Sequence, residues 1–292
     1  MRKRCDIINR NILTEIDMNK KFSVIGVGNI ARAFISALST LSGKFEVPAS
    51  TVTLFNRTPK KIADLKAKGY KTAPTMADAA NAGDIIFLGV KPQNLKEVFT
   101  AIRSEGADLS TKIIVSPCAG VTCSDLAELT GCERIIRIMP NTPMQIGKGV
   151  TEICRSAGVS DKDFQYICRV FSMCGEVITV NEDDMNAMTA ATSSAVALVY
   201  RLICAFSKGA EDCGAQTKNI ENAVAKTFIG AAEMLMTSDK SADELVAAVR
   251  SPKGATEQAL LVFDDKNIDG IIADAIKACA DRCEELGKEY GR

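Results

Sequence analysis

The motif Gly26-Val27-Gly28-Asn29-Ile30-Ala31 follows directly on the short apolar run Phe22-Ser23-Val24-Ile25. A strand that ends in Gly-x-Gly-x-x-Ala and turns into a helix places backbone amides and a helix N-terminus beside the diphosphate of a dinucleotide. The first glycine permits the tight turn, the second lets the backbone approach the diphosphate, and the alanine lets the helix pack closely on the sheet. We therefore predict a dinucleotide site suited to hydride transfer, with contacts from Gly26, Gly28, Asn29, Ile30 and Ala31.

The residues after this turn predict a helix over about Asn29 to Leu41. Its apolar side chains recur at the spacing of one helix face, at Ile30, Phe34, Ala37, Leu38 and Leu41. That spacing is expected of a helix that packs against a sheet. The glycine pattern also occurs in plain strand-to-helix turns, and the amphipathic helix favours the dinucleotide interpretation over that alternative.

The end of the second predicted strand carries no carboxylate. This strand, Val52-Thr53-Leu54-Phe55, ends at Asn56-Arg57-Thr58-Pro59-Lys60-Lys61. In NAD-selective sites a carboxylate here binds the ribose hydroxyls and would repel a 2′-phosphate. Amide, guanidinium and hydroxyl groups favour NADP instead, without excluding NAD, and we expect phosphate contacts from Asn56, Arg57 and Thr58 with Lys60 nearby. The alternative is a solvated basic turn that opens a helix at Pro59.

Three more apolar runs, 84–90, 112–117 and 134–139, predict buried parallel strands. Strands that alternate with helices predict an α/β fold with an open, doubly wound sheet, in which ligands bind beyond the carboxyl ends of the strands. The segments that follow these three runs map to that edge. From them we expect further cofactor contacts at Val90, Lys91, Pro92, Cys118, Ala119, Gly120 and Asn141.

Composition excludes several classes of protein. The 292 residues suffice for two domains, and 36 basic residues balance 36 acidic ones, which gives no indication of nucleic-acid binding. The basic start of the chain is interrupted by Asp6-Ile7-Ile8-Asn9-Arg10-Asn11, which is unlike a signal peptide. The longest uncharged stretch, Met185 to Tyr200, falls short of the roughly 20 apolar residues that span a bilayer. We therefore expect a cytoplasmic protein with no membrane partner.

The eleven cysteines predict neither a disulfide framework nor a metal site. The chain has no Cys-x-x-Cys and no histidine to complete a zinc site, and most cysteines fall inside apolar segments. We expect reduced, small core side chains and no bound metal. Cys279 and Cys283 are one helical turn apart, which indicates packing on a shared face.

The absence of histidine also restricts the chemistry. Reduction of a ketone requires protonation of an alkoxide, for which many dehydrogenases use a histidine, although lysine or tyrosine can replace it. Hydride addition to an iminium carbon gives a neutral amine and no oxyanion. The sequence thus permits C=N reduction especially readily.

The character of the chain changes after residue 180. From Asn181 onward it is rich in alanine and other helix formers, with turn signals near Gly214, Ser238-Asp239 and 251–254. We predict an N-terminal extension over residues 1–20 that can be flexible, an NADP-binding domain over 21–180 and an all-helical domain over 181–292. The uncharged residues from Met185 to Tyr200 would cover more of a helix surface than the single stripe that packs on one core. We therefore expect a homodimer or larger homo-oligomer.

The order of short motifs resembles pyrroline-5-carboxylate reductase over nearly the whole chain after Lys20. The motifs are Gly-x-Gly-Asn-x-Ala, Asn-Arg-Thr, Val-Lys-Pro-Gln, Ala-Gly-Val-Thr, Arg-x-Met-Pro-Asn-Thr-Pro, Gly-Glu-Val and Ser-Pro-x-Gly-Ala-Thr. The late pair, 139–143 and 251–256, is more discriminating than the glycine motif. The resemblance implies a Rossmann-like domain followed by a helical dimerisation domain. It also implies NAD(P)H-dependent reduction of L-1-pyrroline-5-carboxylate to L-proline, the last step of proline biosynthesis.

The resemblance places the substrate at Ser251-Pro252-Lys253-Gly254-Ala255-Thr256. It implies substrate contacts from Ser251, Gly254, Ala255 and Thr256: backbone amides receive the carboxylate, and the Thr256 hydroxyl bonds the ring nitrogen and assists the chemical step. The alternative for this segment is an ordinary Ser/Pro helix cap.

The chain departs from the family pattern at two places. Thr192-Ser193-Ser194-Ala195-Val196-Ala197-Leu198 stands where family members usually have Ser-Gly-Ser-Gly-Pro-Ala-Tyr, and Lys253-Gly254 stands where they have two glycines. These changes leave open a reductase of a different cyclic imine and a non-catalytic, dinucleotide-binding paralogue. A β-hydroxyacid dehydrogenase is disfavoured because the segment from Asn181 to Leu198 lacks the lysine that it would need.

Overall fold

The computed structural model describes residues 20–40 and 47–291. The predictions for residues 1–19 and for Leu41 lie outside these ranges. The chain forms two compact units: the sheet unit runs up to Ser194 and includes the chain from Cys279 on, and the helical unit is Ala195–Ala278. The domain boundary that the sequence predicts between residues 180 and 181 stays a prediction.

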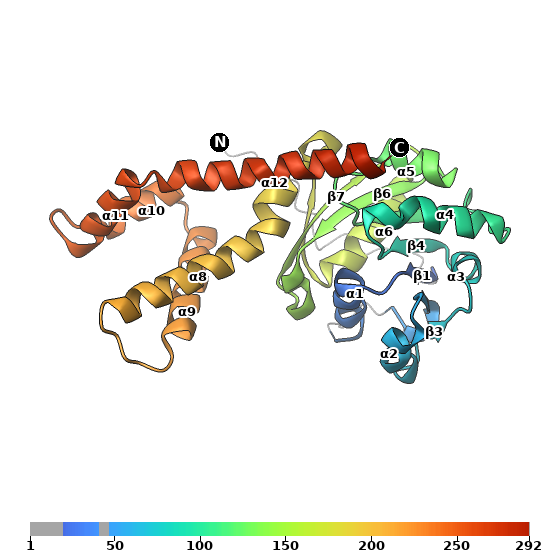
Figure 1. The fold of residues 1–292 in the computed structure, drawn as a ribbon, viewed down its shortest axis with the longest axis horizontal. Helices are drawn as coiled ribbons and strands as arrows, with labels where there is room; N and C mark the ends of the chain where they lie inside the picture. The colour runs from blue at the N-terminus through green and yellow to red at the C-terminus, as the bar shows by residue number, and fades with distance from the viewer. Residues whose placement is uncertain (1–19, 41–46, 292) are drawn as a thin grey trace. The chain divides into compact units, whose positions relative to one another are not determined.

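The sheet unit is built on one eight-stranded sheet with the strand order β3-β2-β1-β4-β5-β6-β7-β8 (Figure 1). The strands are β1 Phe22–Ile25, β2 Val52–Phe55, β3 Lys71–Thr72, β4 Ile85–Leu88, β5 Ile113–Ser116, β6 Ile135–Pro140, β7 Gly149–Arg155 and β8 Gly175–Thr179. Every neighbouring pair is parallel except β6 and β7. The predicted doubly wound sheet is confirmed, and the antiparallel strand β7 is an addition that the sequence patterns did not predict.

Helices cover both faces of this sheet, because the buried apolar strands need cover on each side. These helices are α1 Asn29–Thr40, α2 Ala63–Ala67, α3 Met76–Ala82, α4 Leu95–Ser104, α5 Cys123–Thr130, α6 Asp161–Ser172 and α7 Met185–Thr189. One apolar core joins the sheet to α1 and α6, and a second joins it to α3, α4 and α5. Stacked rings of Phe34, Phe87 and Phe171 fill the centre of the first core.

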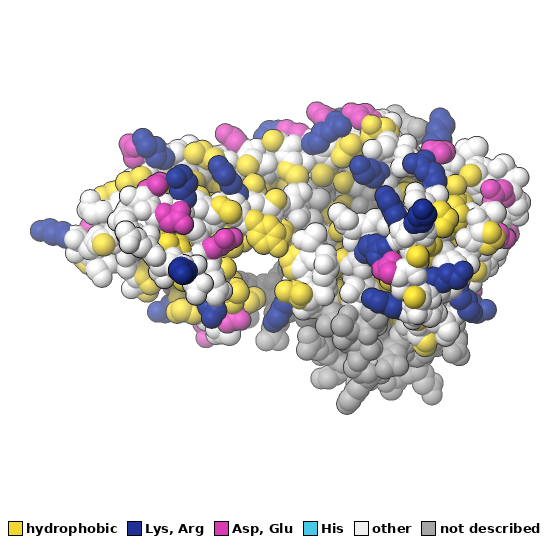
Figure 2. Space-filling view, turned by 60° about the horizontal axis from the view of Figure 1, so that its bottom comes forward, with side chains coloured by type: hydrophobic (Ala, Val, Ile, Leu, Met, Phe, Trp, Pro, Cys, Tyr) yellow, Lys and Arg dark blue, Asp and Glu magenta, His cyan; other side chains and the backbone are white. Residues whose placement is uncertain are grey.

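The helical unit contains no strand among its residues. Its helices are α8 Ala195–Asp212, α9 Ile220–Thr237, α10 Ala242–Val249, α11 Ala255–Asp265 and the first part of α12 Ile268–Tyr290. The predicted turns near Gly214, at 238–239 and at 251–254 all lie between these helices, so the all-helical prediction is confirmed. Figure 2 shows hydrophobic side chains at the surface among the charged ones.

One described helical run, Glu182–Asp212, is long and apolar enough to cross a membrane by length and composition alone. It comprises a short 3-10 turn, α7, the π-helical segment Ala190–Ser194 and α8. Charged residues flank the uncharged stretch from Met185 to Tyr200 on both sides.

Candidate active site

The carboxyl ends of the parallel strands carry the residues that the sequence predicts to bind a cofactor. Because β2, β1, β4, β5 and β6 are neighbours and run in the same direction, their carboxyl ends form one edge of the sheet. The glycine-rich turn follows β1, Asn56 follows β2, Val90 lies just after β4, Cys118 follows β5 and Asn141 follows β6. The fold therefore gathers the predicted cofactor contacts along a single edge.

The turn after β1 requires its first glycine. Gly26 has a φ of +85°, and a Cβ there would lie 2.5 Å from Val90 Cγ1. A Cβ on Gly28 would meet Gly89 O at 3.6 Å, an ordinary contact, so the packing of this chain alone does not exclude a side chain there. Gly89 has a tighter constraint that the sequence patterns did not predict, because a Cβ there would lie 1.9 Å from Gly26 O. The backbones that follow β1 and β4 thus lie in direct contact, with no room for a side chain on Gly26 or Gly89.

The side chain of Asn56 supports the glycine-rich turn. Its Oδ1 accepts a hydrogen bond from Val27 N at 3.0 Å, and its Nδ2 donates to Thr58 O at 3.0 Å. The amide therefore joins the end of β2 to the turn after β1, a role that the sequence did not predict. A carboxylate at this position would add a negative charge at the edge formed by the carboxyl ends of the strands, whereas the amide of Asn56 is neutral.

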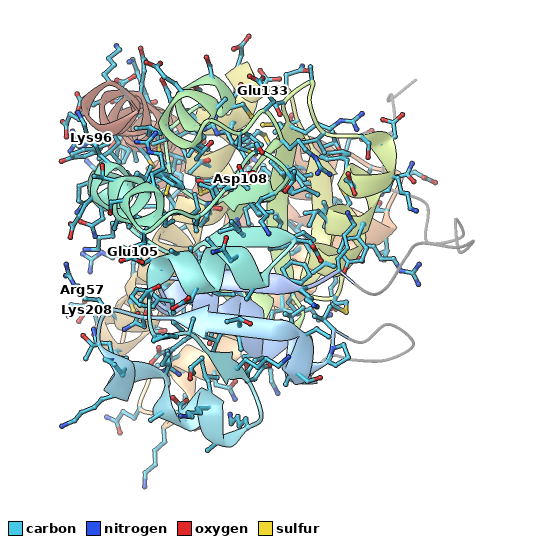
Figure 3. The ribbon with its side chains drawn as sticks, turned by 90° about the vertical axis from the view of Figure 1, so that its right-hand side faces the viewer. Arg57, Lys96, Glu105, Asp108, Glu133 and Lys208 are labelled. Carbon is cyan, nitrogen blue, oxygen red and sulfur yellow. The ribbon has the colours of Figure 1, made fainter. Side chains whose placement is uncertain are left out.

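Arg57 is an exposed cation at this strand end. Its side chain is 82% exposed, extends outward from the ribbon (Figure 3), and lies 3.9 Å from Glu97 Oε1, itself 67% exposed. An exposed pair at that distance binds weakly, so the guanidinium remains available to a phosphate. Arg32 on α1 is engaged instead, because it bonds both carboxylate oxygens of Asp64 at 2.9 and 3.1 Å. The predicted helix start at Pro59 is a 3-10 turn over Pro59–Ile62 that leads into α2.

The segment after β5 packs against the end of the chain. Gly120 has a φ of +78°, and a Cβ there would lie 1.9 Å from Cys283 O and 2.7 Å from Gly287 N on α12. The nearby Cys118 thiol is 3% exposed and contacts Val90 O at 3.5 Å; burial raises its pKa to about 11. Gly120 is thus required by helix packing, whatever it contributes to cofactor binding.

Asn141 is held rigidly at the end of β6. It is 7% exposed, its Oδ1 accepts from Val150 N at 2.9 Å, and its backbone N–H donates to Val150 O at 3.1 Å. Strand β7 therefore fixes the position of this predicted cofactor residue. This is the role of the strand that the sequence patterns missed.

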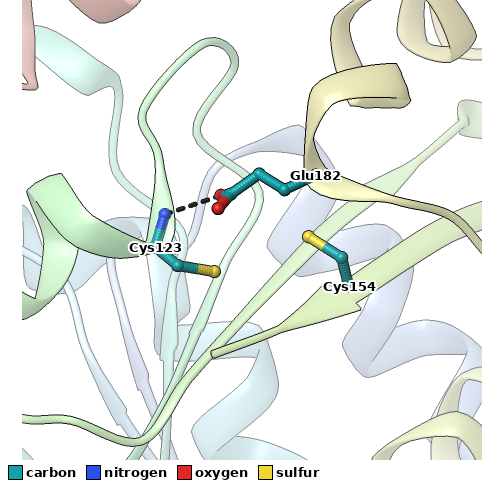
Figure 4. A group of neighbouring side chains, drawn as sticks. All are labelled: Cys123, Cys154 and Glu182. Carbon is teal, nitrogen blue, oxygen red and sulfur yellow. Dashed lines mark hydrogen bonds between the residues drawn. The ribbon is translucent and has the colours of Figure 1, made fainter. Parts of the chain in front are cut away.

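Two buried thiols and a carboxylate lie together between β7, α5 and the turn before α7 (Figure 4). The two sulfur atoms of Cys123 and Cys154 and a carboxylate oxygen of Glu182 lie within 4.8 Å of one another, close enough to hold a metal ion. The carboxylate is already engaged: Glu182 Oε1 accepts from Cys123 N and from Arg137 Nη1, each at 2.7 Å. Burial opposes ionisation of Glu182, but these bonds outweigh it and lower its pKa. We interpret the group as an ion pair that anchors the start of the helical region.

Most of the described cysteines fit the prediction of small core side chains, whereas Cys204 and Cys213 are exposed and Cys279 is half-buried. All cysteines of the described residues are free, and seven of them are buried, at positions 118, 123, 132, 154, 168, 174 and 283. Burial raises the pKa of the Cys168 and Cys174 thiols to about 12. Such thiols stay protonated at neutral pH and are poor nucleophiles.

The predicted substrate segment forms the N-terminus of α11 in the helical unit. Gly254 is the N-cap residue of α11, and no side chain caps this helix. The alternative of a Ser/Pro helix cap is therefore wrong. The N–H of Gly254 donates to Ser251 O at 2.9 Å, while Glu257 Oε2 accepts from Lys253 N at 2.6 Å. The Thr256 side chain is exposed, and the first helical turn leaves the amides of Ala255 and Thr256 without intrahelical carbonyl partners.

Comparison with known proteins accounts for both units. Residues 182–286 match the model of the pyrroline-5-carboxylate reductase dimerisation domain, and residues 21–120 match that of the NADP oxidoreductase, coenzyme F420-dependent family. The curated pyrroline-5-carboxylate reductase of Corynebacterium melassecola is 30% identical, with 91% of this chain and 98% of that protein covered. The chain belongs to the pyrroline-5-carboxylate reductase family. The Escherichia coli enzyme is also 30% identical, over 93% of this chain and 100% of its own length.

Solved reductases of this family share the fold. The Plasmodium falciparum pyrroline carboxylate reductase with NADP bound has a TM-score of 0.83 at 25% identity, with 92% of this chain and 99% of that chain covered. The Coxiella burnetii pyrroline-5-carboxylate reductase has a TM-score of 0.80 at 27% identity, covering 92% and 98%. The family assignment makes the protein an oxidoreductase with an N-terminal Rossmann-like domain.

One departure from the reductase pattern has a backbone consequence. Lys253 stands where pyrroline-5-carboxylate reductases usually have glycine, and its φ is +59°. The left-handed conformation costs an L residue about 1–2 kcal/mol. A glycine at this position would adopt the same turn without that cost.

Proposed function

We propose that this protein reduces L-1-pyrroline-5-carboxylate to L-proline, the last step of proline biosynthesis, with NADPH as the hydride donor. The observation that carries the proposal is the match to curated pyrroline-5-carboxylate reductases over more than nine-tenths of the chain, 91% and 93% in two cases. Both the glycine-rich turn after β1 and the loop before α11 lie within that match.

The residues at the strand-end edge fit NADP. The turn at Gly26 and the start of α1 present backbone amides to a diphosphate, and the positive end of the helix favours the bound anion. Asn56 replaces the carboxylate that would repel a 2′-phosphate, and the exposed Arg57 supplies a guanidinium that can bind that phosphate with two hydrogen bonds. The bound nicotinamide supplies the hydride.

The start of α11 receives the substrate. The amides of Ala255 and Thr256 bind the carboxylate, and the Thr256 hydroxyl bonds the ring nitrogen. The protonated ring nitrogen becomes a neutral amine when the adjacent carbon accepts a hydride, so no oxyanion has to be stabilised and no histidine is needed. Thr256 therefore orients the ring and is not an indispensable acid.

The helical unit joins two copies of the chain. The matched dimerisation domain, 182–286, includes the whole of it, and its helices carry many exposed apolar side chains in a single copy. A partner copy would cover that surface, which also explains the apolar run Glu182–Asp212 without a membrane. We further place the boundary of the cofactor domain near residue 180, and the protein in the cytoplasm without nucleic-acid partners.

A direct assay tests the proposed activity. NADPH oxidation is followed by absorbance with L-1-pyrroline-5-carboxylate, with a six-membered cyclic imine carboxylate and without substrate. Oxidation that depends on the five-membered imine supports the proposal. A higher kcat/KM for the six-membered ring would assign a different imine, and NADPH binding without turnover of either ring would identify a non-catalytic paralogue.

A further inference from the structure

Glu152 is a buried carboxyl group that the cofactor and substrate sites do not use. It lies in the middle of β7, opposite Met139 on β6 and Ile178 on β8, and its exposed fraction is 0%. Among the residues that the structure describes, its Oε2 is the buried side-chain oxygen or nitrogen that lacks a hydrogen-bond partner. A carboxylate in such a place would be costly, because an ionised group without solvent or a counter-ion is strongly destabilised.

Among the residues that the structure describes, no cation is placed to neutralise Glu152. The other charged or titratable side chains on β6, β7 and β8 are Arg137, Cys154, Arg155 and Glu176, and α7 and the π-helical segment carry none. The charged helix α6 packs on the opposite face of β7, in the core that includes Ile153. Arg137 pairs with Glu182 at 2.7 Å, Arg155 pairs with Asp161, and Glu176 is exposed. The surroundings of Glu152 therefore favour its neutral form.

The hydrogen bonds of Thr192 locate the proton. Its Oγ1 lies 2.5 Å from Glu152 Oε1 and 2.6 Å from Met188 O. A hydroxyl carries one proton, so it can donate to only one of these oxygens. The carbonyl of Met188 can only accept, so both contacts are satisfied when Thr192 donates to Met188 and Glu152 donates to Thr192. Burial likewise raises the pKa of Glu152.

A second hydrogen bond joins the π-helical segment Ala190–Ser194 to strand β6. Thr192 belongs to this segment, and its neighbour Ser193 donates to Met139 O at 3.1 Å. Met139 is followed on β6 by Pro140 and by the rigidly held Asn141. The contacts of Thr192 with Glu152 and of Ser193 with Met139 thus hold the segment against β7 and β6.

We propose that Glu152 is a neutral carboxylic acid that donates its proton to Thr192 and so positions the π-helical segment Ala190–Ser194 against Met139 on β6. Glu152 is a positioning residue, and its effect on turnover rests on the proposed function, whereas its protonation does not. Deprotonation at high pH removes the donor, so the single proton of Thr192 turns to the Glu152 carboxylate, the bond to Met188 O is lost and the segment loosens. The reductase then loses activity as Glu152 ionises.

The substitution Glu152→Gln tests this directly, because a glutamine amide keeps the shape and the donor but cannot ionise. Infrared difference spectra should show the C=O band of a protonated carboxyl group in the parent protein and its loss in Glu152→Gln. The matched control Glu176→Gln removes an exposed carboxylate from the neighbouring strand and should leave that band in place. A parent protein with no such band at neutral pH would overturn the proposal.

Stability against pH gives a second readout that needs neither substrate nor activity. A carboxyl group with a raised folded pKa stabilises the fold fully below its ordinary pKa of about 4.5, and this contribution is lost as pH rises through the folded pKa. The Tm of Glu152→Gln relative to the parent should therefore increase with pH, and that of Glu176→Gln should not. A Tm difference that is independent of pH would contradict the proposal even if the assay for proline formation succeeds.

Activity then tests the positioning role. At the alkaline limit we expect kcat/KM of the parent to lie about tenfold below that of Glu152→Gln, with equal values at low pH. Comparison at the same pH cancels the titration of the substrate. Should Glu152→Gln not fold, Thr192→Val removes the acceptor and should shift the carboxyl band; an unshifted band would refute the bond. Identical pH profiles for parent and Glu152→Gln would refute the positioning role alone.

Discussion

The sheet unit buries its large apolar side chains, and the helical unit leaves many of its own at the surface. In the sheet unit, two apolar cores fill both sides of the sheet, and the exposed large apolar side chain among the described residues is Ile146. In the helical unit, residues such as Ile229, Met236, Val249 and Ile271 are 55% to 74% exposed. We propose that another copy of the chain covers the apolar surface of the helical unit, whereas the sheet unit can fold around its own core.

In the proposed function, the two units also divide the chemistry. The sheet unit supplies the strand-end edge with its glycine-rich turn and Arg57, and the helical unit supplies the start of α11 with Thr256. We therefore expect substitutions in the sheet unit to act on the cofactor, and substitutions in the helical unit to act on assembly or substrate.

The largest effect is expected from a charge on the apolar surface of the helical unit. Ile229 lies in the middle of α9 and is 57% exposed in a single copy. If a second copy covers it, Ile229→Asp removes two buried side chains per dimer, about 1.5–3 kcal/mol each, and the Kd of the dimer rises more than about 100-fold. Light scattering at low micromolar concentration should report a monomer for the variant and a dimer or larger species for the parent.

The sheet unit offers a matched control for this substitution. Ile146 is 71% exposed, and Ile146→Asp should leave the assembly unchanged. An Ile229→Asp variant with the same mass as the parent, or a parent that is a stable, active monomer, would show that the difference in apolar exposure between the units has another origin.

A smaller effect is expected at the substrate end of the helical unit. Thr256→Ala should lower kcat/KM by about 10- to 100-fold, since one hydrogen bond of about 1.5–3 kcal/mol is lost in the transition state. NADPH affinity should stay nearly unchanged. The control is Thr237→Ala in the same unit, because the Thr237 hydroxyl bonds its own helix at Glu233 O.

Two results would change this assignment of Thr256. A loss of about 10⁴-fold or more would identify its hydroxyl as an essential acid and not as a positioning group. An unchanged kcat/KM would place the substrate elsewhere.

The smallest effect is expected at the cofactor end of the sheet unit. Arg57→Ala should weaken NADPH binding by about 1–3 kcal/mol and NADH binding by less, because only NADPH carries the 2′-phosphate. Calorimetric titration of both coenzymes measures the difference. Arg103→Ala, at the opposite end of α4 from the strand-end edge, serves as the control. Equal losses for NADPH and NADH would remove Arg57 from the phosphate site.

The patterns that predicted the sheet are local ones. Strands β1, β2, β4, β5 and β6 are short apolar runs bounded by turn residues, and α1 shows its helical spacing within twelve residues. Strand β7 was missed because its centre, Thr151-Glu152, is polar although buried, so neither a continuous apolar run nor an alternating pattern marks it. Its burial depends on pairing with β6 and β8, which no local pattern contains.

The predicted site residues show the same division. The motif around Gly26 identified the turn because a positive φ is a local property of a strand-turn-helix unit. The atoms that a side chain on Gly26 would meet belong to Gly89 and Val90 after β4, and the motif does not contain them. Asn56 was predicted as a phosphate contact, yet its bond to Val27 N lies across two strands. Gly120 was predicted as a cofactor contact, and its lack of a side chain is needed by α12, more than 160 positions later in the chain.

Residue order alone established the dinucleotide fold, the carboxylate-free end of β2, the helical second half and the family, because each rests on side chains within a few positions of one another. Tertiary structure established which apolar surface lacks cover, how Asn141 is held, and which side chain the buried Glu152 contacts. These depend on distances between atoms far apart in the chain: the 2.5 Å contact joining Glu152 to Thr192 spans 40 positions. Burial and hydrogen-bond geometry arise when the chain closes on itself, so they are properties of the folded state.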